Sequence, residues 1–147
     1  AGAPELLAAH LGRLADGDYF ALLAFLEMCE RHARPLERLR HRVRDAAGVA
    51  TTLGFGPRFL HSTGQAHKGG PSSGLFLQVT ADPRDDLPVP GQRLTFGQVL
   101  AAQARGDFEV LRARGRRALR VHLAGDPGAG LERLDAAVAE ALSRISR

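Results

Sequence analysis

The sequence predicts an α/β protein with a mostly parallel sheet that is covered by helices on both faces. Apolar runs without polar alternation, such as residues 19–26, are typical of parallel strands that are buried on both sides. These runs alternate with helical patterns along the 147 residues, which is the order expected of β-α-β units. A hydrophobic fraction of 44% and a charged fraction of 24% are typical of a globular domain, so we treat residues 1–147 as a single domain.

The first half of the chain predicts two helices, two strands and a short third helix. An opening helix follows Pro4, where leucines recur at helical spacing. After the strand at residues 19–26, a charged helix is expected to begin at Pro35 and to end near Gly48. Residues 49–55 form the second strand, and the HSTGQ segment behind it predicts a turn that leads into a short helix.

The second half predicts two further strands with helices behind them. Residues 75–80 are a third buried strand, followed by a proline-rich loop. Thr95 is the expected N-cap of one or two helices that are interrupted near Gly106. Residues 118–123 form the fourth strand, and an amphipathic helix closes the domain.

The densest group of functional side chains lies in residues 54–68, which leave the second strand at the edge where parallel strands end. Glycines in this segment let the backbone approach an anion. Arg58 and Lys68, the only lysine in the chain, supply positive charge. His61 and His67 titrate near neutral pH. The segment therefore predicts a site for a phosphorylated, hydroxyl-rich small molecule.

Other kinds of site have little support in the sequence. The glycines match neither the dinucleotide-binding fingerprint nor the Walker A spacing, so no nucleotide cofactor is expected. No cysteine or carboxylate stands between His61 and His67, and we expect no metal. The serines lack the nucleophile-elbow pattern of a serine hydrolase. One structural alternative stays open: the HSTGQ turn could be a hydrogen-bonded corner in which His61 only caps backbone groups.

Charge and composition also limit the partners and the compartment. The net charge of +4 would suit nucleic acid, but an aromatic fraction of 5% leaves few platforms on which bases could stack. No apolar run approaches the ~20 residues that span a bilayer, and the first residues do not resemble a signal peptide. A single cysteine, Cys29, fits a reducing compartment. We expect a cytoplasmic protein that binds neither nucleic acid nor a membrane.

Two segments carry a resemblance to a known family. GPRFLHSTGQAHKGGP at residues 56–71 and GLFLQ at residues 74–78 resemble the C-terminal end of glucose-6-phosphate isomerase, most of all the isomerase half of fused bacterial transaldolase/glucose-6-phosphate isomerase proteins. The similarity continues in parts as far as Leu123. It implies the second sugar-isomerase (SIS) domain, a three-layer αβα sandwich. It also implies interconversion of glucose 6-phosphate and fructose 6-phosphate, a step of glycolysis and gluconeogenesis that needs no cofactor.

The resemblance assigns roles to few residues. His61 falls on the position of the histidine that acts as acid and base in opening the sugar ring, and that reaches the neighbouring subunit's site in the dimer. We expect Arg58, Gln65 and Lys68 to contact the sugar phosphate, although the family has no principal catalytic group at the position of Lys68.

The departures from the family pattern matter as much. The glutamate that moves a proton between C1 and C2 has no counterpart; Glu37 or Asp45 could substitute, but their spacing does not favour either. The closing lysine motif and the first SIS domain are also missing from the sequence. We therefore expect part of a larger isomerase that is inactive alone, pairs with the first SIS domain of its parent and forms a homo-oligomer. The alternative is a non-catalytic SIS module that binds a sugar phosphate or packs against a partner domain.

Overall fold

The computed structural model describes residues 2–146, and its centre is a sheet of four strands. All neighbouring strands are parallel, in the order β2-β1-β3-β4. Their bounds are β1 (Tyr19–Phe25), β2 (Ala50–Phe55), β3 (Gly74–Ala81) and β4 (Arg117–Leu123). The predicted α/β class and the four predicted strands are therefore confirmed.

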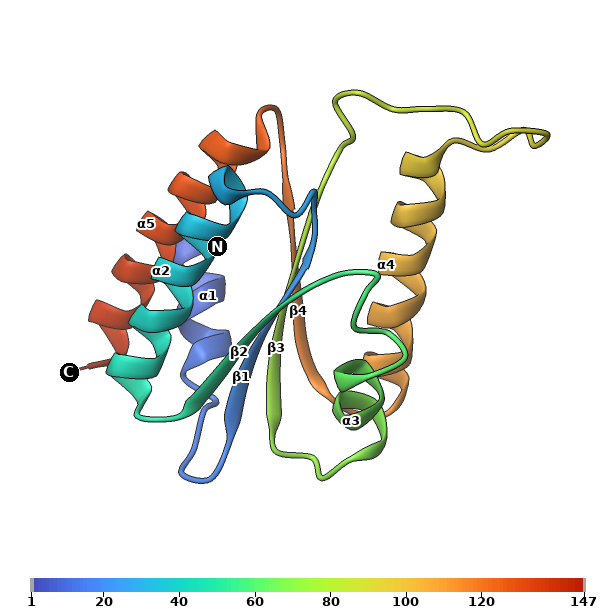
Figure 1. Ribbon diagram of the computed structural model, residues 1–147. Helices are drawn as coiled ribbons and strands as arrows, with labels where there is room; N and C mark the ends of the chain where they lie inside the picture. Colours follow the sequence, from blue (N-terminus) through green and yellow to red (C-terminus); the bar gives the residue numbers. More distant parts are fainter. Residues whose placement is uncertain (1, 147) are drawn as a thin grey trace.

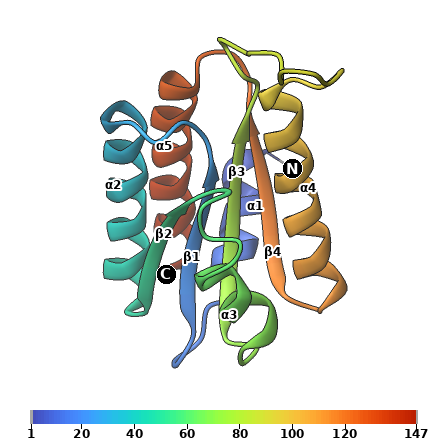
Figure 2. The same ribbon diagram turned by 45° about the vertical axis from the view of Figure 1, so that its right-hand side comes forward.

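Helices cover both faces of this sheet, so the predicted three-layer αβα sandwich is also confirmed. Figures 1 and 2 show α1, α2 and α5 on one face and α3 and α4 on the other. Their bounds are α1 (Ala3–Leu11), α2 (Glu30–Ala47), α3 (Thr63–Gly69), α4 (Phe96–Ala113) and α5 (Pro127–Ile145). None of the helices within residues 2–146 is both long and apolar enough to cross a membrane.

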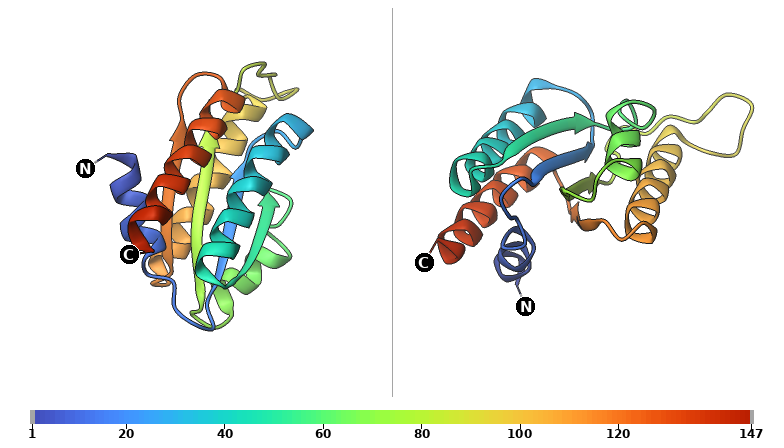
Figure 3. Two further views of the ribbon diagram at one scale, coloured as in Figure 1. Left: turned by 90° about the vertical axis from the view of Figure 1, so that its left-hand side faces the viewer. Right: turned by 90° about the horizontal axis from the view of Figure 1, so that it is seen from below.

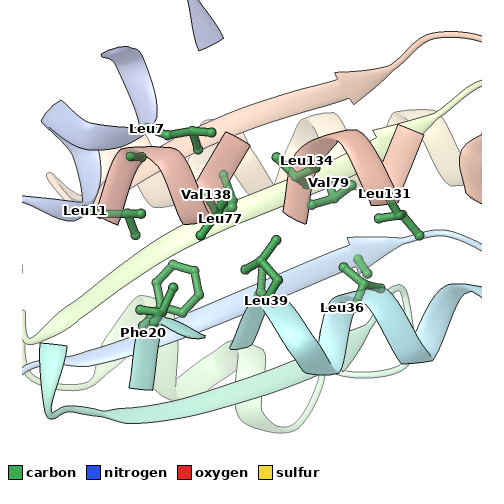
Figure 4. Close-up of a cluster of buried hydrophobic side chains, with 14 of the residues drawn as sticks. Leu7, Leu11, Phe20, Leu36, Leu39, Leu77, Val79, Leu131, Leu134 and Val138 are labelled. Atoms are coloured by element: carbon green, nitrogen blue, oxygen red, sulfur yellow. The ribbon is translucent and has the colours of Figure 1, made fainter. Parts of the chain in front are cut away.

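The central strands divide their side chains between two cores because successive residues of a strand point to opposite faces. Phe20, Leu22 and Ala24 of β1 belong to the larger core, under α1, α2 and α5. Figure 4 shows this core, with side chains from α2 and α5 meeting those of the sheet. Leu23 and Phe25 belong to the smaller core, under α3 and α4. Continuous apolar strands are thus explained by burial on both sides.

Two helices differ from their predicted extent. The second helix begins at Glu30 instead of Pro35, because the Cys29 carbonyl accepts hydrogen bonds from the N–H groups of His32 and Ala33 at 3.1 and 2.9 Å and forms a first turn before the proline. The helix α4 runs without a break through Gly106. Asp107, the residue after this glycine, is buried and forms an ion pair with Lys68. The predicted interruption of the helix near Gly106 is therefore absent.

The strand order creates a crevice between β1 and β3. The chain leaves β1 for β2 through α2, and leaves β3 for β4 through α4, so the two connections move apart in opposite directions and on opposite faces. Such a topological switch point is the usual ligand site of an open α/β sheet. A long loop between β3 and α4, residues 82–95, projects from the body beside this crevice, as Figure 3 shows.

Candidate functional site

A cleft of about 990 Å³ lies at the carboxyl edge of the sheet, at the switch point between β1 and β3. Its walls come from the ends of β1, β3 and β4, the first turns of α2, α4 and α5, and the loop at residues 82–87. Figure 1 shows these helices beginning at the edge where the strands end. Helix N-termini carry partial positive charge, which favours an anionic group near them. The lining also holds charged side chains of both signs: carboxylates of Glu27, Asp82, Asp85 and Asp86, and guanidinium groups of Arg31, Arg84 and Arg120.

An ion-pair cluster at the cleft rim ties three segments together. Asp126 caps α5 by accepting a hydrogen bond from the N–H of Ala129 at 3.0 Å. The guanidinium groups of Arg31 and Arg84 both pair with the same carboxylate. The Ala129 N–H group, and then the charges of the two arginines, hold the pKa of Asp126 below its ordinary value. The cluster joins α2, the projecting loop and α5 around the cleft.

Polar groups at the ends of β1, β3 and β4 face the same cleft. The Nδ1 atom of His32 lies 2.9 Å from the carbonyl oxygen of Glu27, which fixes the imidazole near the end of β1. The Thr80 hydroxyl lies 2.9 Å from His122 Nδ1, and His122 Nε2 lies 3.2 Å from Asp82 Oδ1. The cleft therefore holds carboxylates, imidazoles and a hydroxyl, which are groups that can carry out proton transfer.

Arg58 and His61 lie beside this cleft rather than inside it. Gly56 and Pro57 line the cleft, but Arg58 turns toward a second, shallow hollow of about 260 Å³ along β2. There its Nη1 atom donates a hydrogen bond to the Met28 sulfur at 3.1 Å. The His61 side chain is exposed and makes no hydrogen bond with another residue in the part of the chain that the structure describes. The expectation that His61 caps backbone groups is therefore not met by residues 2–146.

Gln65 takes part in holding the loop that carries His61. Its side-chain amide donates a hydrogen bond to the carbonyl oxygen of Leu60 at 2.9 Å. This contact gives Gln65 a structural role within the domain. Its side chain is otherwise exposed on α3, the helix that follows His61.

The prediction that all of residues 54–68 gather at the carboxyl edge is wrong for His67 and Lys68. The loop at residues 56–62 carries the chain across the face of the sheet, and the short helix α3 lies near the opposite edge, where the strands begin (Figure 1). There His67 Nδ1 lies 2.9 Å from the hydroxyl of Tyr19, the first residue of β1. The Lys68 ammonium lies 2.6 Å from Asp107 Oδ1, and its carbonyl accepts a hydrogen bond from Arg116. Lys68 thus lies near the starts of the strands, whereas the cleft lies at their carboxyl ends.

The two carboxylates considered as substitutes for the family glutamate also lie outside the cleft. Glu37 pairs with Arg40 at 2.6 Å on the surface of α2. Asp45 pairs with Arg44 at 2.8 Å near the end of the same helix, at the edge opposite the cleft. Within residues 2–146, no three His, Cys, Asp or Glu side chains are grouped so that they could hold a metal ion.

Comparison by sequence with known proteins finds no matching family model and no matching curated protein. Among solved structures, the chain is similar to the hypothetical protein TT0462 from Thermus thermophilus, with a TM-score of 0.70 and 19% sequence identity over 95% of this chain. The match covers 37% of that protein, so the chain spans little more than a third of its length. At this identity the likeness supports the αβα fold alone.

Sequence reasoning missed most residues that line the cleft, although their positions at the ends of predicted strands were a signal for them. Glu27 stands just behind the first strand, Asp82 directly follows the third, and His122 stands near the end of the fourth. The ends of parallel strands share one edge, so these positions could have been considered together. Residues 54–68 concentrate polar residues in one segment, whereas the cleft collects single residues from several segments.

Proposed function

We propose that this chain is the C-terminal SIS domain of a glucose-6-phosphate isomerase, and that it works in the cytoplasm as part of a longer protein with a first SIS domain. The reaction is the interconversion of glucose 6-phosphate and fructose 6-phosphate. The αβα sandwich and the cleft at its switch point are compatible with a sugar-phosphate site. The residues of the HSTGQ segment connect this general fold to one particular reaction.

One observation carries the proposal: the position of His61. Its imidazole is exposed on the loop behind β2 and does not line the cleft of its own domain. The resemblance implies a histidine that acts in the site of a neighbouring subunit, and an exposed imidazole beside the carboxyl edge suits that role. Arg58, three residues earlier, is exposed on the same loop and can support the negative charge of the substrate.

Isomerase assays of the isolated chain and of its full-length parent test this proposal. Glucose 6-phosphate formed from fructose 6-phosphate is measured by coupling to a dehydrogenase. We expect activity in the parent and none in the isolated chain. His61→Ala in the parent is expected to lower kcat by ~10²-fold or more, whereas His41→Ala, at a half-exposed position of α2 outside the cleft, serves as the matched control. A parent that is inactive on both sugar phosphates would refute the proposal.

The second candidate is a non-catalytic SIS module that binds a sugar phosphate or packs against a partner domain. The positions of Glu37 and Asp45 favour it, because both carboxylates are ion-paired on the surface of α2 and neither lies in the cleft. In that case His61→Ala leaves any turnover of the parent intact. Binding of glucose 6-phosphate without turnover, measured by calorimetry, would favour this candidate over the enzyme.

A further inference from the structure

Three side chains form a connected series along one wall of the cleft. Thr80 stands at the end of β3 and is 6% exposed. Its hydroxyl oxygen lies 2.9 Å from Nδ1 of His122 on the neighbouring strand β4. The other ring nitrogen lies 3.2 Å from the Asp82 carboxylate, whose side chain is 79% exposed. The imidazole is therefore held on both sides, by a buried hydroxyl and by a carboxylate open to water.

This arrangement fixes how protons are distributed on the neutral ring. An exposed aspartate is ionised at neutral pH and can only accept a hydrogen bond, so the carboxylate favours a proton on His122 Nε2. Nδ1 then accepts a hydrogen bond from the Thr80 hydroxyl. If Nδ1 gains a proton, the hydroxyl can rotate and accept a hydrogen bond from Nδ1–H, because a hydroxyl is both donor and acceptor. A hydroxyl, an imidazole and a carboxylate in series are the groups of a catalytic acid–base system, which is recognised by its geometry and not by sequence order.

We propose that His122, held between Thr80 and Asp82, is the acid–base residue that moves a proton between the two oxygens of the sugar phosphate during isomerisation. This role rests on the proposed isomerase function, and it would replace catalytic groups of the family that have no counterpart in the sequence. Thr80 transmits the proton at the cleft wall. Asp82 is a positioning residue that orients the imidazole and balances its charge when it is protonated.

Aldose–ketose isomerisation also needs a base at carbon, and the same cleft offers one. Glu27 follows the central strand β1, and its carboxylate makes no hydrogen bond or ion pair with other residues of the described chain. The other carboxylates that line the cleft are placed differently. Asp82 pairs with His122, Asp86 accepts hydrogen bonds from the N–H groups of Leu87 and Gly97, and Asp85 lies on the projecting loop. Glu27 is therefore the carboxylate that we assign to the carbon-bound proton.

The two groups together balance the reaction. In the forward direction the Glu27 carboxylate takes the proton from C2, and the electron pair of the C2–H bond forms the C1–C2 double bond. The carbonyl oxygen at C1 receives a proton through Thr80 from the cationic form of His122, which becomes neutral. The enediol then loses its O2 proton along the same path to His122. Glu27 returns its proton to C1, which leaves fructose 6-phosphate and both residues in their first states.

Positive charge at the cleft wall can support the intermediate of this sequence. Arg120 lies on the same strand as His122, two residues earlier, and lines the cleft. A guanidinium group in this place stabilises the negative charge of an enediolate when the two proton transfers are not simultaneous.

Variants of the full-length parent test the inference. We expect His122→Gln to lower kcat by ~10²-fold or more with KM changed less than about threefold, since the lost group acts on the transition state. Thr80→Val is expected to lower kcat by about tenfold, and Thr80→Ser to restore it because the hydroxyl returns. Glu27→Gln should abolish exchange of the C2 hydrogen with solvent deuterium. His41→Gln and Glu109→Gln, both outside the cleft, are the matched controls.

Nitrogen NMR of the His122 ring distinguishes a loss of its orientation by Asp82 from general damage to the fold. In the unsubstituted parent we expect the His122 ring to carry its neutral-state proton on Nε2, and in Asp82→Asn to become a mixture of tautomers while the melting temperature stays unchanged. An active parent in which His122→Gln keeps full kcat would overturn this inference and leave the isomerase function standing. A parent without isomerase activity would instead overturn the function and this role together.

Discussion

The ammonium group of Lys68 lies 2.6 Å from the Asp107 carboxylate and joins α3 to α4, with side-chain exposures of 16% and 2%. Removing one member leaves a buried charge without compensation, so Lys68→Met is expected to lower the free energy of unfolding by about 3–5 kcal/mol. The double variant Lys68→Met, Asp107→Leu should regain most of this loss. Urea unfolding of the unsubstituted protein and both variants measures the two effects.

The alternative role of Lys68, contact with the substrate, predicts a different result. In that case the folded Lys68→Met protein would bind the sugar phosphate more weakly. Lys68 lies at the edge opposite the cleft, so we expect Lys68→Met in the full-length parent to leave KM unchanged in whatever fraction stays folded. A stable Lys68→Met variant with a raised KM would contradict the structural role.

Two buried histidines are expected to make the protein less stable at mildly acidic pH. His10 Nε2 lies 2.9 Å from the Phe76 carbonyl oxygen, and burial lowers the pKa of this imidazole below the ordinary 6.5. Burial also lowers the pKa of His67, against an opposing effect of the nearby Asp107 charge. Just below pH 6.5 the unfolded chain therefore binds more protons than the folded one. The stabilisation is complete above about pH 6.5 and is lost as the pH falls below it.

Urea midpoints measured above and below this pH check the prediction. His10→Gln can still donate a hydrogen bond to Phe76 and removes one titrating group, so its stability should depend less on pH. His41→Gln, at a half-exposed position, should keep the full dependence. Equal pH dependence in both variants would assign the effect to other groups.

Two glycines of the same short helix should respond to alanine in opposite directions. A Cβ atom at Gly64 would lie 2.7 Å from the Phe59 carbonyl oxygen, which already accepts the Gly64 N–H at 2.8 Å. Gly64→Ala is expected to cost about 1–3 kcal/mol of stability and to move the loop that carries His61. At Gly69 a Cβ would meet open space, so Gly69→Ala should stabilise by about 0.5 kcal/mol. Thermal melts of the two variants test the contrast.

The strands could be predicted because their side chains are buried on both faces, which leaves a continuous apolar run. The first strand was predicted at residues 19–26 and ends at Phe25. The helix boundaries were harder to place. Pro35 marks a helix start in most sequences, but here a turn held by the Cys29 carbonyl precedes it. The spacing of residue types along the sequence does not reveal a backbone hydrogen bond of this kind.

The candidate site was predictable only in part, because it depends on the order of the strands. Nothing in the periodicity of residues 50–55 or 74–81 indicates that both pair with β1, and without that order the switch point cannot be located. The sequence likewise gives no sign that the chain crosses the face of the sheet between β2 and the end of α3. His67 and Lys68 were therefore grouped with Arg58 and His61, although the chain separates them.

The packing of α1 against α5 has a consequence for how the protein forms during synthesis. These helices contact each other on one face of the sheet, and Glu5 pairs with Arg144 at 2.5 Å across them. The strand β1 likewise pairs with β3, which lies far along the chain, and Tyr19 stands opposite Gly74 in this pairing. Contacts so distant along the chain make folding slow. On the ribosome, the apolar side chains that α1 buries, Leu7 and Leu11, therefore stay without their α5 partners until residues 127–145 emerge.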